Sequence, residues 1–218
     1  MGMAVDAAAG ENQRLMLETY RHHARVGEFD HLRQFLDPDA FAIDVGANVG
    51  QYALTLAAEC RNCVVIEPIH ELAWLGDALP PNCLFYNVAA GAKEGLVTLT
   101  IPIEAGQPRY PLATLGDSYD GREGITQETP VRTLDSILAE CCADERIGFI
   151  KIDVEGGETA VIQGALQTLN RWRPNLQVEI WQESVREMEP MFAALAYHGL
   201  FFFGSRLFDF RHYDPAVH

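Results

Sequence analysis

The chain has 218 residues, of which 48% are hydrophobic and 22% charged, and its formal net charge at pH 7 is -15. This length predicts one domain with a substantial core, and the acidic balance opposes a nucleic-acid partner because phosphate backbones select basic surfaces. No apolar run reaches the roughly 18 residues of a membrane span, and residues 1–10 lack the features of a signal peptide, so we expect a cytoplasmic protein.

The first predicted elements are one or two amphipathic helices over about residues 11–36. Their apolar residues recur at helical spacing among charges: Leu15, Met16, Tyr20, Ala24, Phe29, Leu32, Phe35 and Leu36. We expect residues 1–38 to form a helical cap over the binding site of a domain that occupies 39–218. Histidines 22, 23 and 31 of this segment, and 212 and 218 near the tail, are expected at the surface.

The next segment, FAIDVGANVGQY, predicts a strand over 41–45, a glycine turn and a helix over 51–59. Backbone N–H groups in such a turn can meet carboxylate or phosphate oxygens of a small molecule. Asn48 stands where a dinucleotide fingerprint needs its second glycine, so an NAD site is disfavoured. A second strand over 63–67 ends in Glu67, whose carboxylate can accept hydrogen bonds from two ribose hydroxyls.

Further strands and helices alternate along the chain, which predicts an α/β fold. We expect a helix at 70–78, strands at 84–88 and 96–103, a strand ending near 153, a helix at 158–169, a strand at 176–181, a helix at 185–197, and a hairpin of 200–203 and 207–210 around Gly204-Ser205-Arg206. Residues 104–129 are rich in Gly, Pro, Asp and Tyr. They predict a lid or substrate loop, or alternatively a disordered insertion.

The cysteines show no framework of the kind that secreted domains use. Cys60 and Cys63 form a C-x-x-C pair, but no second pair follows at zinc-ribbon spacing, and a structural zinc site needs about four ligands. We therefore expect reduced thiols.

Polar residues interrupt the strand 149–155, where a buried parallel strand is normally apolar throughout. Alternation on an extended strand places Lys151, Asp153 and Glu155 on one face. Together with Asp44, Glu67 and Glu179, these carboxylates are expected to converge at the carboxyl edge of the sheet, where open α/β folds bind ligands. Lys151 either pairs with Asp153 or Glu155 or has a catalytic or orienting role. Glu158 is expected to stabilise the start of its helix.

Four stretches resemble the FkbM family of methyltransferases: IDVGANVGQY, IEP at 66–68, VRTLDSIL and IKIDVEGGETAVIQGA. The resemblance implies a Rossmann-like class I methyltransferase fold, with a mostly parallel seven-stranded sheet and a C-terminal antiparallel hairpin. It also implies S-adenosyl-L-methionine as cofactor and a hydroxyl group of a small natural product, sugar or glycolipid as methyl acceptor. The implied cofactor residues are Asp44, Gly46, Ala47, Asn48, Gly50 and Glu67, with Asn87, Ala89 and Ala90 near the adenine.

For catalysis, Asp153 is the first candidate and Glu155 the second, because a strand-end carboxylate can orient or deprotonate a bound hydroxyl. Alternatively, Asp153, Glu155 and Glu179 could hold a divalent metal, although we expect a metal-independent enzyme. Two other functions remain open: a catalytically silent binding module with the cofactor fold, or a nucleotide-dependent oxidoreductase.

Overall fold

The computed structural model describes residues 2–25, 29–115, 124–181, 184–203, 206–214 and 217, with side chains described from residue 10 onward. The chain forms two compact units, Met1–Glu179 and Ile180–His218. Three predictions concern residues outside this described part. They are the hairpin turn at Gly204 and Ser205, the surface position of His218, and residues 116–123 of the lid.

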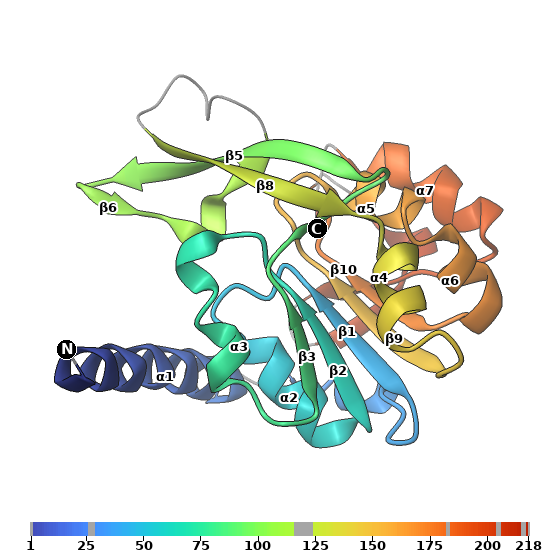
Figure 1. Ribbon diagram of the computed structural model, residues 1–218. Helices are drawn as coiled ribbons and strands as arrows, with labels where there is room; N and C mark the ends of the chain where they lie inside the picture. Colours follow the sequence, from blue (N-terminus) through green and yellow to red (C-terminus); the bar gives the residue numbers. More distant parts are fainter. Residues whose placement is uncertain are drawn as a thin grey trace. The chain divides into compact units, whose positions relative to one another are not determined.

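The first unit is built on a five-stranded sheet in the order β10-β9-β1-β2-β3, and every neighbouring pair is parallel (Figure 1). In the central strand, Ile43 lies opposite Val64 on one side and Ile150 on the other. The prediction of an α/β fold with a mostly parallel sheet is confirmed, but this sheet has five strands in the described chain, not the seven that the resemblance implied. Its strands are β1 Phe41–Val45, β2 Asn62–Ile66, β3 Cys83–Tyr86, β9 Ile147–Ile152 and β10 Asn175–Val178.

Helices lie on both sides of this sheet, with α1 and α2 on one side and α4 and α6 on the other in Figure 1. The helix predicted over 158–169 is divided at Gly164, where a Cβ atom would lie 2.1 Å from the carbonyl oxygen of Gly91. The helices of this unit are α1 Gly2–Arg25, η1 Arg33–Phe35, α2 Gln51–Glu59, η2 His70–Leu72, α3 Leu75–Ala78, α4 Leu134–Cys141, α5 Glu158–Gln163 and α6 Leu166–Trp172.

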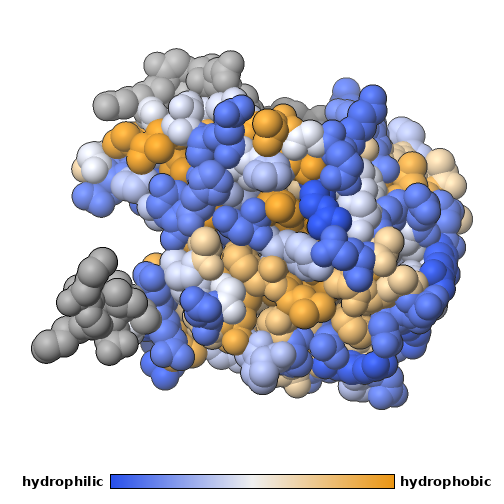
Figure 2. Space-filling model, in the orientation of Figure 1, coloured by the Kyte–Doolittle hydropathy of each residue, from blue (hydrophilic) through white to orange (hydrophobic). Residues whose placement is uncertain are grey.

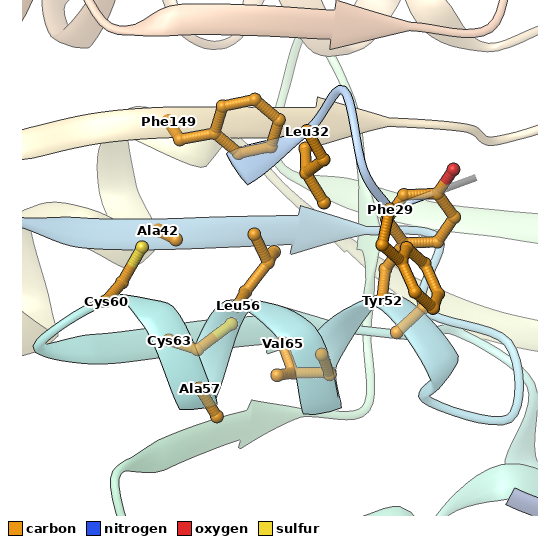
Figure 3. Packing of buried hydrophobic residues seen from close by; sticks show 12 residues of the cluster. Phe29, Leu32, Ala42, Tyr52, Leu56, Ala57, Cys60, Cys63, Val65 and Phe149 are labelled. Carbon is orange, nitrogen blue, oxygen red and sulfur yellow. The ribbon is translucent and has the colours of Figure 1, made fainter. Parts of the chain in front are cut away.

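A hydrophobic core fills the space between α2 and the sheet. Figure 3 shows Leu56 of α2 directed toward the strands, and Leu56 and Phe149 are both almost fully buried. Phe29 closes the end of this cluster through an edge contact with Tyr52, whose ring centroid is 5.2 Å away. Burial of each such large apolar side chain contributes about 1.5–3 kcal/mol, so this core fixes the position of the turn between β1 and α2.

A second sheet contains part of the segment that the sequence predicts as a loop. Here β5, Gly95–Glu104, pairs antiparallel with β8, Gly124–Arg132, in the strand order β4-β8-β5-β6. The loop prediction over 104–129 is therefore wrong for 124–129, where the β-branched residues Ile125, Thr126 and Thr129 favour a strand. The remaining elements are β4 Ala89–Ala90, β6 Gln107–Pro108, η3 Tyr110–Leu112 and β7 Thr114–Leu115.

The second unit contains the predicted C-terminal helix and hairpin. Strands β11, Leu200–Phe203, and β12, Arg206–Asp209, pair antiparallel as expected, and the rings of Phe201 and Phe208 stack with centroids 5.6 Å apart. The hairpin is a two-stranded sheet of its own rather than the end of the parallel sheet. The other elements are α7 Val185–Ala194 and η4 Phe210–His212. Within the described chain, no helix combines the length and the apolar character that crossing a bilayer requires.

Candidate functional site

A cavity of about 520 Å³ lies at the carboxyl ends of the parallel strands. The segments that follow β1, β2, β9 and β10 line it on one side, and residues of α1, β4, β5 and η3 contribute to the rest of its wall. Ligands of open α/β sheets bind at this edge, because the turns between strands and helices meet there. The cavity is therefore where the sequence predicted a site.

The glycine turn after β1 has a conformation that other residues would strain. Gly46 has φ +78°, and a Cβ atom on it would lie 1.7 Å from the carbonyl oxygen of Asp153. The N–H groups of Gly46 and Ala47 donate to the carbonyl oxygen of Ile66, at 2.9 and 3.2 Å. Both N–H groups therefore have a partner inside the protein. They are not free to bind a ligand in the way that the sequence suggested, and the turn contributes its backbone surface to the cavity.

Not every predicted cofactor residue of this turn faces the cavity. Gly46 and Asn48 line it, whereas Ala47 is 1% exposed and is not among the lining residues. Gly50 also lies behind the turn, where φ is +84° and its N–H donates to the carbonyl oxygen of Ala47 at 2.8 Å. Ala47 and Gly50 therefore shape the turn from behind.

Glu67 joins the turn after β1 to the turn after β2. Its Oε2 accepts the N–H of Asn48 at 2.7 Å and its Oε1 accepts the N–H of Ile69 at 2.9 Å. The side chain lines the cavity although the residue is only 4% exposed, and burial raises the pKa of its carboxyl to about 7. Each oxygen has lone-pair capacity for one more donor, which suits a pair of ribose hydroxyls.

Asn87 supports the same turn from below. Its Nδ2 donates to the carbonyl oxygens of Glu67, at 2.7 Å, and Ile69, at 3.1 Å. Asn87 is not among the lining residues, whereas Ala89 and Ala90 line the cavity next to this turn. The structure thus places Asn87 as a support for the turn and the two alanines at the surface of the cavity.

Lys151 lies beneath the cavity in a charge cluster with the buried Asp44 and the partly exposed Asp153. Its Nζ is 3.5 Å from Asp44 Oδ1, 3.2 Å from Asp153 Oδ2 and 3.1 Å from the carbonyl oxygen of Gly46, to which it donates. Burial alone would lower the Lys151 pKa, but the charges of Asp44 and Asp153 outweigh it and raise that pKa. Burial raises the pKa of the Asp44 carboxyl, and the positive charge of Lys151 only partly opposes this increase.

Neither Asp44 nor Lys151 reaches the cavity surface. Asp44 is fully buried and Lys151 is 3% exposed. Lys151 therefore forms the ion pair with Asp153 that was one alternative predicted from the sequence, and its ammonium also donates to the backbone of the glycine turn.

The remaining acidic residues reach the cavity from two neighbouring strands. Ile152 of β9 lies opposite Val178 of β10, so the residues that follow them, Asp153 and Glu179, emerge side by side, and both line the cavity. Burial, followed by the negative charge of Asp153, raises the pKa of Glu179.

Glu155 also lines the cavity, but the predicted strand alternation does not explain its position. Strand β9 ends at Ile152, and Glu155 has φ +53° in the turn that follows. Glu158 closes this turn, because its Oε1 accepts the N–H groups of Val154 and Gly156, which supports its predicted role at the helix start. Among the described side chains, no group of three or more His, Cys, Asp or Glu is placed to hold a metal.

Sequence reasoning predicted a helical cap and a substrate loop at the site but did not identify which residues of these segments line the cavity. Leu15, Thr19 and His23 of α1 line the cavity, as do Tyr110 and neighbouring residues of η3. His23, which was expected at the surface, is half-buried and lines the cavity. The spacing of four residues, which puts Leu15, Thr19 and His23 on one helical face, was the available signal.

Comparisons with known proteins show the family and the fold of the chain. The model of the methyltransferase FkbM domain matches residues 44–198. The structure is similar to that of methyltransferase FkbM from Methylobacillus flagellatus KT, with a TM-score of 0.53 and 18% sequence identity over 78% of this chain and 42% of that one. A proposed S-adenosylmethionine-dependent methyltransferase from Listeria monocytogenes gives a TM-score of 0.24 and 18% identity, over 30% of this chain and 33% of that one. No curated protein matches the chain. The matched part of the chain covers 42% of the Methylobacillus protein, which is less than half of its length.

Proposed function

The chain belongs to the FkbM methyltransferase family, and from this premise we propose that it transfers a methyl group from S-adenosyl-L-methionine to a hydroxyl group of a small natural product, sugar or glycolipid. The observation that carries the proposal is the Glu67 carboxylate, held by two backbone N–H groups at the surface of the cavity.

The residues present fit this cofactor. A ribose needs an acceptor for two hydroxyls, and Glu67 offers both oxygens. Gly46 lets the turn lie against Asp153 without a side chain between them. The acidic lining also suits a molecule that carries a sulfonium and an ammonium charge. When bound, the cofactor would supply an electrophilic methyl carbon.

The protein itself has to place the acceptor hydroxyl and receive its proton. Lys151 lies 3.2 Å from Oδ2 of Asp153 and stabilises this carboxylate, while burial and the charge of Asp153 raise the pKa of Glu179, which therefore retains a proton more readily. Asp153 is therefore the group that accepts the hydroxyl proton, at the oxygen that Lys151 does not hold.

Binding of S-adenosylhomocysteine tests the proposed cofactor. Saturation with this ligand at 100 times its dissociation constant should stabilise the protein by about 2.7 kcal/mol, whereas NAD should leave the melting temperature unchanged. The Glu67→Ala variant should bind S-adenosylhomocysteine at least about tenfold more weakly, because both ribose contacts are lost. Glu71→Ala is the matched control, since Glu71 is exposed on η2 and does not line the cavity.

The catalytic assignment needs a second readout. Asp153→Asn should retain S-adenosylhomocysteine binding and slow transfer of a labelled methyl group to candidate glycans and secondary metabolites. Stabilisation by NAD but not by S-adenosylhomocysteine would favour the oxidoreductase. Cofactor binding without transfer to any hydroxyl compound would favour the silent binding module.

A further inference from the structure

We propose that one face of α1, together with η3, forms the acceptor subsite, and that this subsite admits neutral or positively charged hydroxyl compounds with an apolar face and rejects anionic ones. The inference rests on the proposed function, because it names the class of molecule that the same cavity methylates. It assigns a specificity role to Leu15, Thr19 and His23.

The face of α1 that lines the cavity is fixed by the packing of its other side. Met16 is 2% exposed and lies in a buried cluster with Val49 and Leu75, and the ring of Tyr20 stacks on Phe29 with centroids 5.5 Å apart. With these contacts, the stripe at positions 15, 19 and 23 lines the cavity. The match to the family domain begins at residue 44, so this wall comes from outside the matched region.

The opposite wall comes from the second sheet. Leu99 of β5 lines the cavity together with Tyr110 and Pro111 of η3 and Ala113. Tyr110 and Ala113 also pack against the cluster that holds Met16, which fixes this wall relative to α1. Figure 2 shows the surface hollowed between the second sheet and the N-terminal helix. Leu15, Leu99 and Tyr110 thus offer a ring or alkyl face a contact surface beside the carboxylates.

The charge of the cavity limits what this surface can hold. Its ionisable lining consists of four carboxyl groups, from Glu67, Asp153, Glu155 and Glu179, and the imidazole of His23; none of the described lining residues is a lysine or arginine. Lys151 lies beneath the surface and already pairs with two aspartates. An anionic acceptor would therefore meet like charges, whereas an amine would be attracted.

Three hydroxyphenyl compounds of matched size test this selection: tyramine with a cationic tail, tyrosol with a neutral one, and 4-hydroxyphenylacetate with an anionic one. Calorimetry should be run on the free protein and on protein saturated with S-adenosylhomocysteine. We expect tyramine and tyrosol to bind at least about tenfold more tightly than 4-hydroxyphenylacetate. Thr19→Arg should narrow this gap.

Gln13→Arg is the matched control, because it adds the same charge to an exposed position of α1 that does not line the cavity. It should leave the order of the three compounds unchanged. The inference would be overturned if the anion bound as tightly as the other two compounds, or if none of the three compounds bound. It would also be overturned if Thr19→Arg and Gln13→Arg changed the three affinities in the same way. Failure of S-adenosylhomocysteine to bind would overturn the proposed function instead, while the free protein would still report the charge preference of the cavity.

Discussion

Substitution of Gly46 by alanine tests how closely the glycine turn has to approach β9. Gly46 and Gly106 have nearly the same backbone conformation, with φ +78° and +76°, so the conformational cost of an alanine is shared, at about 1–2 kcal/mol. They differ in their surroundings. A Cβ on Gly46 would lie 1.7 Å from the carbonyl oxygen of Asp153, whereas a Cβ on Gly106 has nothing within 4 Å. Relief of such a contact requires a backbone shift, which adds about 1–3 kcal/mol or more.

Urea unfolding at pH 7 measures the difference between the two variants. We expect Gly106→Ala to lose about 1–2 kcal/mol of unfolding free energy and Gly46→Ala to lose about 2–5 kcal/mol. Only Gly46→Ala should also weaken S-adenosylhomocysteine binding, because a shifted turn displaces Asn48 from Glu67. Equal losses in the two variants, with intact ligand binding, would refute the argument that close approach to Asp153 requires glycine at position 46.

Three other measurements address the buried charges and thiols. Lys151→Met should reduce the unfolding free energy by about 3–5 kcal/mol, because Asp44 stays buried without its cation, and adding Asp44→Asn should recover part of the loss. S-adenosylhomocysteine affinity should fall by up to about tenfold per unit as the pH drops below the Glu67 pKa of about 7, because the protonated carboxyl loses acceptor capacity; a flat profile from pH 6 to 8 would contradict this role. Iodoacetamide should label Cys141 with a midpoint near pH 7, because the thiol of Cys142, 3.5 Å away, lowers the Cys141 pKa to about 7, and Cys142→Ala should move that midpoint toward about 8.5.

Much of the central sheet could be predicted because its signals are local. The run from Phe41 to Val45 is apolar apart from Asp44 and ends at a glycine, and the structure has the strand over the same five residues. The second sheet was only partly recognisable in this way, because β5 was predicted over 96–103 but its partner β8 was not. Its strand β8 starts after a segment rich in Gly and Asp and contains only one fully buried position, Thr129, so apolar alternation was weak. Its pairing with β5 is a long-range contact that sequence spacing does not reveal.

The site was predictable to the extent that strand ends determine it. Because parallel strands end at one edge, Glu67, Asp153 and Glu179 could be placed together from sequence. The sequence could not show which of the charged groups reach the surface of the cavity. Lys151 and Asp44 sit in adjacent registered positions on β9 and β1, and their mutual attraction keeps both below the cavity. The position of His23 at the cavity depends on the packing of α1, which is fixed by the buried side chain of Met16. This is a tertiary contact, and the sequence alone does not show it.

The carboxylate of Glu67 has a consequence for how tightly and how fast a nucleoside could bind. Because it already ties two turns together, the walls of the binding cleft are rigid before any ligand arrives, and association has little protein to order. A preorganised cleft loses little conformational entropy on binding, so variants that loosen it should chiefly shorten the residence time of the ligand and leave its rate of entry nearly unchanged.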